Sequence, residues 1–477
     1  MGTVNPSQVH ANGVNGLTGE YLLPPLDSAA VAGRAKQATD DPRITARLEQ
    51  LHRRQSEDFY GLPFNVRAED VASAGWAIVF SSEEDDEVRD ALDPLIEHRR
   101  GTVDAARLKI LQHHPGETWT EWLRAQHTAP GNVDPEKVPY YVLLVGSPDR
   151  IPFSFQYLLD VEYAVGRLDF DDADGYRRYV AALKDHENAA SAPRDPSAVF
   201  FGTRHEFDAA TQLSADSLVG PLAASFGPDG RFGRDVAGYR IETRLGETAT
   251  KSALTEILAG AGPLGRPTLL FSATHGMGGW PPGHPDQAAR HGALLCQDWP
   301  GLGRIAPTQY FASGDVDRDA RVNGLIAFLF ACFGAGTPEF DDFAQTPGAP
   351  PPELAAKPFV ASLPKRLLSH EAGAALAVIG HVDQAWGYSF LSGGEEQLLP
   401  FQNAIGRILV GQPVGYAMKD FNEKYAALSS NLSSVLKEMQ STGRRVADDE
   451  LARLWTERND SQNYVLLGDP AVALKPL

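Results

Sequence analysis

The chain has 477 residues, of which 43% are hydrophobic and 22% charged, and its formal net charge is −19. This length exceeds what one hydrophobic core usually organises, so we expect two packed units or one large unit with an appended subdomain. The acidic balance, without a Lys- or Arg-rich segment, speaks against nucleic acid as the main partner, because phosphate binding needs concentrated positive charge.

Targeting features are absent from the sequence. No apolar run approaches the roughly 18 residues of a membrane span, so we expect no membrane association. Residues 1–16 have neither the basic region nor the apolar region of a secretory signal. The two cysteines, Cys296 and Cys332, are too few for a disulfide framework and suit a reducing compartment. We therefore predict a cytoplasmic protein.

The first part of the chain divides into an arm and an α/β unit. Residues 1–45 mix Gly, Asn, Ser and Pro without sustained periodicity, which predicts a flexible arm or a segment laid over the domain surface. In residues 46–194, apolar runs alternate with helical patterns, an order typical of βαβ units and a parallel sheet. The predicted strands are 75–80, 140–146 and 164–168, and the predicted helices are 86–100 and 172–189.

The segment SAPRDP at 191–196 reads as a linker into a second α/β unit, residues 195–477. Its apolar runs are rich in Leu, Val, Ile and Phe, as expected for strands buried on both faces. The predicted strands are 197–203, 238–245, 266–274, 324–332, 374–382 and the start of 463–474. The predicted helices lie near 215–226, at 252–259 and from 411 to about 457. Between them, 337–357 is rich in proline and acidic residues and should form an exposed, mobile loop.

Two of these strands end in a reactive residue. His275 follows the strand 266–274, Cys332 ends the strand 324–332, and glycines come soon after each. If the strands are neighbours in a parallel sheet, imidazole and thiol project from the same edge. An imidazole can activate a thiol as base and stabilise the thiolate. The N–H groups of Gly276 and Cys332 would then receive a developing oxyanion.

Each half of this pair has an ordinary explanation. A buried cysteine at a strand end is usually a small core residue, and a histidine after a strand is usually structural. The pair in this strand context is more specific. Competing chemistries find little support, since we find no GxSxG elbow, P-loop, HExxH or CxxC pattern.

The blocks around these residues resemble the gingipain-like cysteine peptidases, which share the caspase fold. The resemblance runs from Tyr140 to the end of the chain. It rests on YYVLLVGSPDRIPF, YAVGRLDFDDADGYRRYV, FSATHGMGGW, FLFACFGAG, AVIGHVDQAWGYSF and NYVLLGDPAVAL. It implies an α/β fold of the caspase and gingipain type, in which a parallel sheet with helices on both faces forms the catalytic subdomain, beside an N-terminal α/β subdomain.

The resemblance also assigns roles to residues. It makes His275 the catalytic histidine and Cys332 the nucleophile. It places Trp386 beside the pocket for the residue before the scissile bond and Gln384 on the adjoining substrate-binding strand. A core aromatic is the alternative for Trp386. The acidic residue that orients the histidine in the family falls at His205 or Glu206, which leaves the third catalytic member open.

Specificity can be read in two ways. Asp216 matches an aspartate at the base of the pocket in arginine-specific gingipains, and a carboxylate there would bind Arg or Lys. Alternatively, Ser214 or Asp216 caps the following helix. Arg204 offers the opposite specificity, because caspases use arginine in this region to select aspartate.

We therefore predict a cysteine endopeptidase with a Cys–His dyad that cleaves protein or peptide substrates after a basic residue. Control by an activator protein, a small-molecule signal or cleavage is expected, with 337–357 and the N-terminal arm as candidate control segments. The alternatives are cleavage after Asp, a catalytically silent caspase-like interaction domain, and a hydrolase of small amides. No cofactor is expected; the calcium ligands of related enzymes have no match here, so calcium stays an unsupported option.

Overall fold

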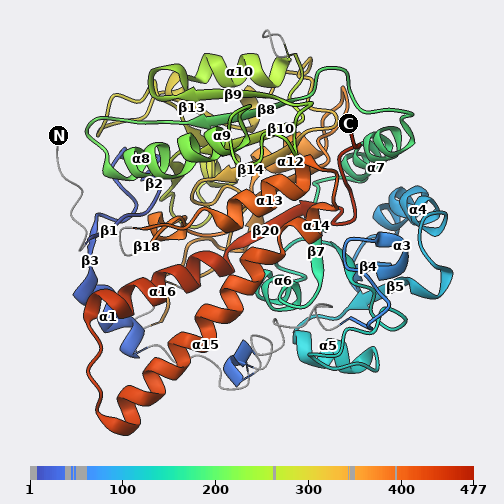
Figure 1. Ribbon diagram of the computed structural model, residues 1–477, viewed down its shortest axis with the longest axis horizontal. Helices are drawn as coiled ribbons and strands as arrows, with labels where there is room; N and C mark the ends of the chain where they lie inside the picture. Colours follow the sequence, from blue (N-terminus) through green and yellow to red (C-terminus); the bar gives the residue numbers. More distant parts are fainter. Residues whose placement is uncertain are drawn as a thin grey trace.

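The computed structural model describes residues 8–37, 44–46, 48–49, 62–260, 265–341, 343, 350–392 and 395–477. A ten-stranded sheet runs through this part of the chain (Figure 1). In spatial order its strands are β5 (Leu108–His113), β4 (Trp76–Ser81), β6 (Tyr141–Val145), β7 (Ala164–Leu168), β20 (Tyr464–Gly468), β17 (Ala377–His381), β14 (Ile326–Phe330), β10 (Leu269–Ala273), β8 (Ser197–Gly202) and β9 (Arg240–Leu245).

The sheet consists of two parallel halves that run in opposite directions. Neighbouring strands pair in parallel throughout, except that β17 and β20 pair antiparallel. Strand β20, near the end of the sequence, lies between β7 and β17 and joins the halves. The boundary predicted near residue 194 therefore does not divide the sheet, because both predicted units contribute strands to it.

The inner strands of the sheet, all of them predicted from the sequence, differ from the edge strands in burial. The eight inner strands are buried at every position, so both faces of the sheet are covered. The edge strands β5 and β9 are partly exposed. The predicted α/β class, a mostly parallel sheet with helices, is confirmed.

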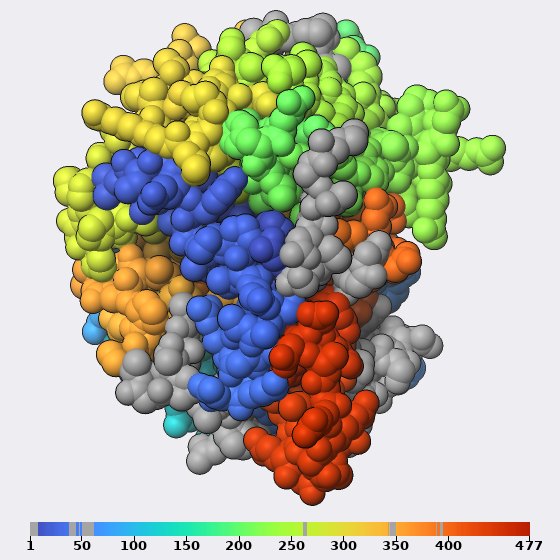
Figure 2. All heavy atoms as spheres, turned by 90° about the vertical axis from the view of Figure 1, so that its left-hand side faces the viewer, coloured from blue at the N-terminus to red at the C-terminus, as the bar shows by residue number. Residues whose placement is uncertain are grey.

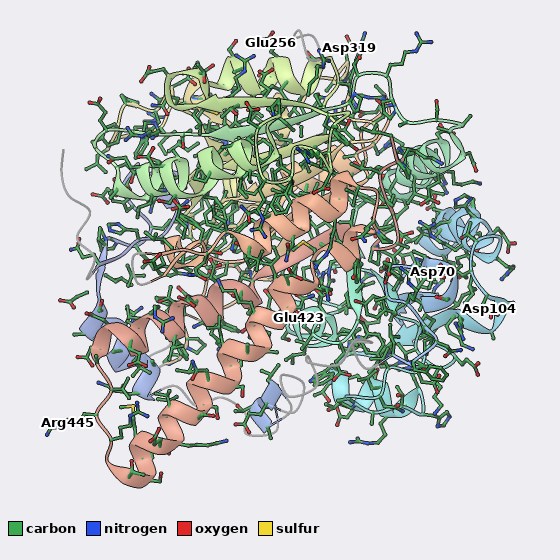
Figure 3. The ribbon with its side chains drawn as sticks, viewed as in Figure 1. Asp70, Asp104, Glu256, Asp319, Glu423 and Arg445 are labelled. Atoms are coloured by element: carbon green, nitrogen blue, oxygen red, sulfur yellow. The ribbon has the colours of Figure 1, made fainter. Side chains whose placement is uncertain are left out.

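Strand β5 was not predicted, because its sequence LKILQH lacks a long apolar run and Ile110 is half exposed. A short 3-10 turn leads into it, and Asp104 caps this turn by accepting the N–H of Ala106 at 3.0 Å. Asp70 likewise caps α3 (Val71–Ala74) ahead of β4. Both carboxylates are labelled in Figure 3.

The remaining helices surround the sheet. They are α1 (Ser28–Gln37), α4 (Asp86–Arg100), α5 (Trp119–Ala125), α6 (Phe153–Asp160), α7 (Ala173–Asn188), α8 (Ala209–Ser214), α9 (Gly220–Phe226), α10 (Lys251–Ala259), α11 (Pro285–Arg290), α12 (Ser362–Leu368), α13 (Leu399–Leu409), α14 (Val414–Ala417), α15 (Lys419–Thr442) and α16 (Asp448–Gln462). A π-helical turn, Ala215–Val219, connects α8 to α9. None of the described helices is long and apolar enough to cross a membrane.

The long helical stretch predicted from residue 411 consists of α14, α15 and α16. Helix α15 ends at Gly443, whose φ of 70° is left-handed and therefore favours glycine. Helices α15 and α16 then pack against each other, and α1 from the N-terminal arm packs on α16. Figure 1 shows this group at one end of the molecule.

Several short strands complete the fold. One small sheet contains β13 (Tyr310–Phe311), β12 (Leu294–Leu295), β11 (Gly276–Gly278) and β2 (Gly13–Asn15). The pairs are β1 (Gln8–Val9) with β3 (Leu26–Asp27), β15 (Gly336–Thr337) with β16 (Phe359–Val360), and β18 (Leu391–Ser392) with β19 (Glu395–Glu396). Part of the loop predicted at 337–357, namely 342 and 344–349, lies outside the described residues.

The N-terminal arm lies across one face of the molecule rather than extending from it. Figure 2 shows it as a blue band that runs from the yellow region near residue 300 towards the red C-terminal helices. Val9 and Ala11 are buried in one hydrophobic cluster with residues of α1 and α16, and Val14 is buried in another with Met277. Apolar contacts therefore hold the arm along its length.

Candidate active site

His275 and Cys332 both lie at the carboxyl edge of one half-sheet. Strands β10 and β14 pair in parallel with Ala273 opposite Phe330. Each of the two candidate residues follows two positions after this pair, so the chain delivers both to the same edge. Both side chains are fully buried.

The imidazole of His275 is held by a carboxylate. Its Nε2 lies 2.6 Å from Oδ2 of Asp208, and both side chains are buried. Asp208 also caps α8, since it accepts the N–H groups of Ala210 and Thr211. Burial raises the pKa of Asp208, but the charge of His275 and the hydrogen bonds from His275 and Thr211 outweigh it and keep this pKa well below its usual value. An ionised carboxylate therefore holds the imidazole at its Nε2 atom.

The other ring nitrogen of His275 has no such contact. Its Nδ1 is buried and has no hydrogen-bond partner among the described residues. Because Asp208 occupies Nε2, Nδ1 is the atom that can exchange a proton with a thiol or a leaving amine.

The residues predicted for the third position lie elsewhere. His205 contacts Thr211 Oγ1 at 3.5 Å and packs edge-on against Trp299, and burial lowers the pKa of His205 to about 4. Glu206 is exposed, and its backbone carbonyl accepts a hydrogen bond from Gln212. Neither residue hydrogen-bonds to His275. The carboxylate that does so belongs to Asp208, two residues after Glu206, where α8 begins. Sequence reasoning missed Asp208, since an aspartate before a helix has a sufficient explanation as a cap.

Cys332 sits at a sharp turn. The following residue, Phe333, has a φ of 58°, which is a left-handed conformation that costs a bulky residue of order 1–3 kcal/mol. The N–H of Phe333 donates to the carbonyl of Asp383 at 2.8 Å, so the segment after β17 stabilises the turn.

The thiol of Cys332 faces the same segment after β17. Its Sγ accepts the N–H of Ala385 at 3.2 Å. Burial raises the pKa of this thiol well above its usual value, and the hydrogen bond from Ala385 offsets the effect only in part. The cysteine is therefore a thiol in this closed arrangement.

The two backbone N–H groups predicted to bind an oxyanion meet at one atom. The N–H of Gly276 and the N–H of Cys332 both donate to the carbonyl oxygen of Asn12, at 3.0 and 3.3 Å. Gly276 lies close to the backbone of Cys332: a Cβ added to Gly276 would be 1.8 Å from the carbonyl oxygen of Cys332. Only glycine can bring its N–H to this place.

The segment around Asn12 is extended and pairs with the chain beyond β17. The N–H of Asn12 donates to the carbonyl of Ala385 at 2.8 Å, and the N–H of Gly387 donates to the carbonyl of His10 at 3.1 Å. Between them, Ala11 and Trp386 form an antiparallel bridge. Residues 385–387 therefore bind an extended peptide through its backbone, in the manner of strand addition.

After Asn12 the arm continues along the small sheet. Strand β2 pairs in parallel with β11, with Gly13 opposite Gly276. The chain then turns back, and the hydroxyl of Tyr21 donates to Oδ1 of Asp208 at 3.2 Å. The arm therefore reaches the backbone donors and the carboxylate that holds His275.

The predicted specificity residues Arg204 and Asp216 contact each other. The guanidinium of Arg204 donates to both carboxylate oxygens of Asp216, at 2.8 and 2.9 Å, and both side chains are partly exposed. Each charge thus satisfies the other instead of lining a separate pocket. Neither Ser214 nor Asp216 caps a helix here, since Ser214 bonds back to the Thr211 carbonyl within a continuous helical stretch.

Trp386 and Gln384 flank Ala385, and Trp386 forms the bridge to Ala11 of the arm. The Trp386 ring is buried against Phe343, with a centroid distance of 4.3 Å, in the cluster that also holds Val9 and Ala11. Gln384 is buried, and its side-chain amide lies 3.5 Å from a carboxylate oxygen of Asp341. The core interpretation and the substrate-flanking interpretation of Trp386 are therefore compatible.

The described residues also bear on metal binding. Within them, we find no group of three or more His, Cys, Asp or Glu side chains that could hold a metal ion. The expectation of no cofactor stays a prediction.

Comparison with known proteins gives a loose likeness. No family model matches the chain, and no curated protein matches it significantly. Among solved structures, the chain is similar to one described as that of a protease, with 11% identity, a TM-score of 0.45 and coverage of 84% of this chain and 79% of the other. It is also similar to the complex of the pro- and mature domains of Porphyromonas gingivalis RgpB, a gingipain, with 12% identity, a TM-score of 0.41 and coverage of 84% and 80%. The second likeness agrees with the resemblance drawn from the motifs, but at these TM-scores the functional conclusion has to rest on the geometry of the site.

Proposed function

We propose that the protein is a cysteine peptidase in which Cys332 is the nucleophile, His275 the general acid and base, and Asp208 the residue that orients the imidazole. The observation that supports this most strongly is the convergence of two backbone N–H groups on a single peptide carbonyl beside the thiol. Such a pair stabilises the negative charge that develops on the carbonyl oxygen during acyl transfer.

The reaction follows from these positions. His275 takes the proton of the Cys332 thiol at Nδ1, and Asp208 stabilises the imidazolium that forms. The thiolate attacks the peptide carbonyl, whose oxygen remains bound to the N–H groups of Gly276 and Cys332. His275 then protonates the leaving amine and later activates water, which hydrolyses the thioester.

Two other functions fit the site less well. A catalytically silent interaction domain does not need a thiol and a carboxylate-bound imidazole at one sheet edge, together with two convergent donors. A hydrolase of small amides does not need a peptide-binding segment, whereas residues 385–387 bind the backbone of an extended chain. The substrate is therefore a peptide or protein.

The experiment that tests this proposal removes the convergence of donors. In Gly276→Ala, the new Cβ would lie only 1.8 Å from the carbonyl oxygen of Cys332. The backbone at residue 276 must therefore move away from Cys332. We expect kcat/KM on a hydrolysed library peptide to fall by about 10²–10³-fold, the cost of losing one oxyanion donor.

Gly314→Ala is the matched control, because a Cβ there meets no atom within 4 Å. Thermal unfolding of both variants separates lost chemistry from lost folding. If folded Gly276→Ala kept the kcat/KM of Gly314→Ala, the N–H of Gly276 would not bind the oxyanion and the proposal would lose its main support.

A further inference from the structure

The arm lies in the candidate active site in the position of a substrate. Asn12 donates its N–H to Ala385 and presents its carbonyl oxygen to the two backbone donors, while His10 pairs with Gly387. These contacts fix the register of the segment. The peptide bond that follows the carbonyl of Asn12, the bond to Gly13, is therefore the one presented to the thiol.

Gly13 fits this register because it has no side chain. A Cβ added to Gly13 would lie 2.9 Å from Sγ and 3.2 Å from Cβ of Cys332. The Cα of Gly13, which carries the nitrogen that leaves upon cleavage, thus lies close to the thiol, and no larger residue fits after the bond in this arrangement.

The Asn12 side chain, which precedes this bond, is enclosed by the protein. It is only 1% exposed, and neither its amide oxygen nor its amide nitrogen has a hydrogen-bond partner among the described residues. The charges predicted to select Arg, Lys or Asp, on Asp216 and Arg204, are paired with each other. Before the bond, the structure therefore encloses a short neutral side chain that has no charged partner.

We propose that the bond between Asn12 and Gly13 is a self-cleavage site, and that the enzyme takes peptides with asparagine before the scissile bond. This inference rests on the proposed peptidase function. The sulfur of Cys332 attacks the carbonyl carbon of Asn12, and the bond to the nitrogen of Gly13 breaks as His275 protonates that nitrogen. Water then hydrolyses the thioester, which leaves a carboxyl group on Asn12 and restores the thiol.

Cleavage here also frees the site. Residues 10–12, before the cut, are held to residues 385–387 by backbone pairing. After the cut they are no longer joined to the rest of the chain, so they can dissociate. The control expected of the N-terminal arm would then act through this bond.

The sequence contains an internal control, because Asn15–Gly16 repeats the same dipeptide three residues later. Asn–Gly bonds are chemically labile, so spontaneous breakage would affect both sites. The test is N-terminal sequencing and intact mass of the purified full-length chain during incubation, for the wild type and for Cys332→Ala.

We expect a new N-terminus at Gly13 in the wild type only, with Asn15–Gly16 intact in both proteins. Asn12→Gln should slow the appearance of Gly13 about 10–200-fold, the usual penalty of one extra methylene in a fitted pocket. Faster cleavage in Asn12→Arg than in the wild type would overturn the substrate class.

The outcomes separate the two proposals. If a library peptide is hydrolysed by the wild type but not by Cys332→Ala, while Asn12–Gly13 stays intact, the self-cleavage inference is wrong and the peptidase stands. If nothing is hydrolysed in a Cys332-dependent way, both proposals are wrong. If Gly13 appears equally in both proteins while a library peptide is hydrolysed only by the wild type, the self-cleavage inference alone is wrong.

Discussion

Cys332→Ala should reduce peptide hydrolysis by about 10⁶-fold, because loss of the nucleophile removes the covalent route as a whole. The substitution removes a buried sulfur from a site already held by backbone contacts, so the fold should persist. The measurement is hydrolysis of a peptide library at high concentration, since an external peptide must displace residues 10–12 from residues 385–387.

Cys296→Ala provides the matched control. Cys296 is the other cysteine of the chain, it is equally buried, and its Sγ donates to the carbonyl of Leu294, at 3.6 Å. We expect its hydrolysis rates to stay close to those of the wild type. Undiminished hydrolysis by a folded Cys332→Ala protein would exclude this cysteine as the nucleophile.

Asp208→Asn should lower kcat by about 10⁴-fold, as expected when the acceptor behind a catalytic imidazole is replaced by an amide that favours the wrong tautomer. Asn is as good a helix cap as Asp, so α8 should still begin at the same place. The loss therefore reports on His275 and not on the helix. Steady-state kinetics on a hydrolysed library peptide measure it.

Glu206→Gln separates the two acidic residues of this loop. Glu206 is exposed and has no side-chain contact with His275, so its substitution should leave kcat unchanged. A large loss in Glu206→Gln with a small one in Asp208→Asn would restore the position first predicted from the sequence and contradict the hydrogen bond seen here.

Much of the fold could be predicted because the inner strands are buried on both faces and appear as unbroken apolar runs. The positions of His275 and Cys332 at one sheet edge follow from the same runs, since each residue stands directly at a strand end. The edge strand β5 escaped prediction because His113 is its only buried residue, so its sequence lacks a long apolar run.

The rest of the site depends on contacts between distant segments. Asp208 looks like a helix cap in the sequence, and only the folded loop brings it to His275. The arm contributes backbone atoms of Asn12 and Gly13, and hydrogen bonds made by backbone atoms leave no mark on residue types. The pairing of Arg204 with Asp216 could not be foreseen either, because each charge alone suggested a pocket.

The central claim is that Cys332 forms a thioester with its substrate, and acid-quenched mass spectrometry during turnover tests it most directly. With the ester of a hydrolysed library peptide in excess, we expect a protein mass raised by the acyl group, and peptide mapping should place that group on Cys332 and not on Cys296. Turnover without an adduct, an adduct on another residue, or no turnover at all would contradict the account.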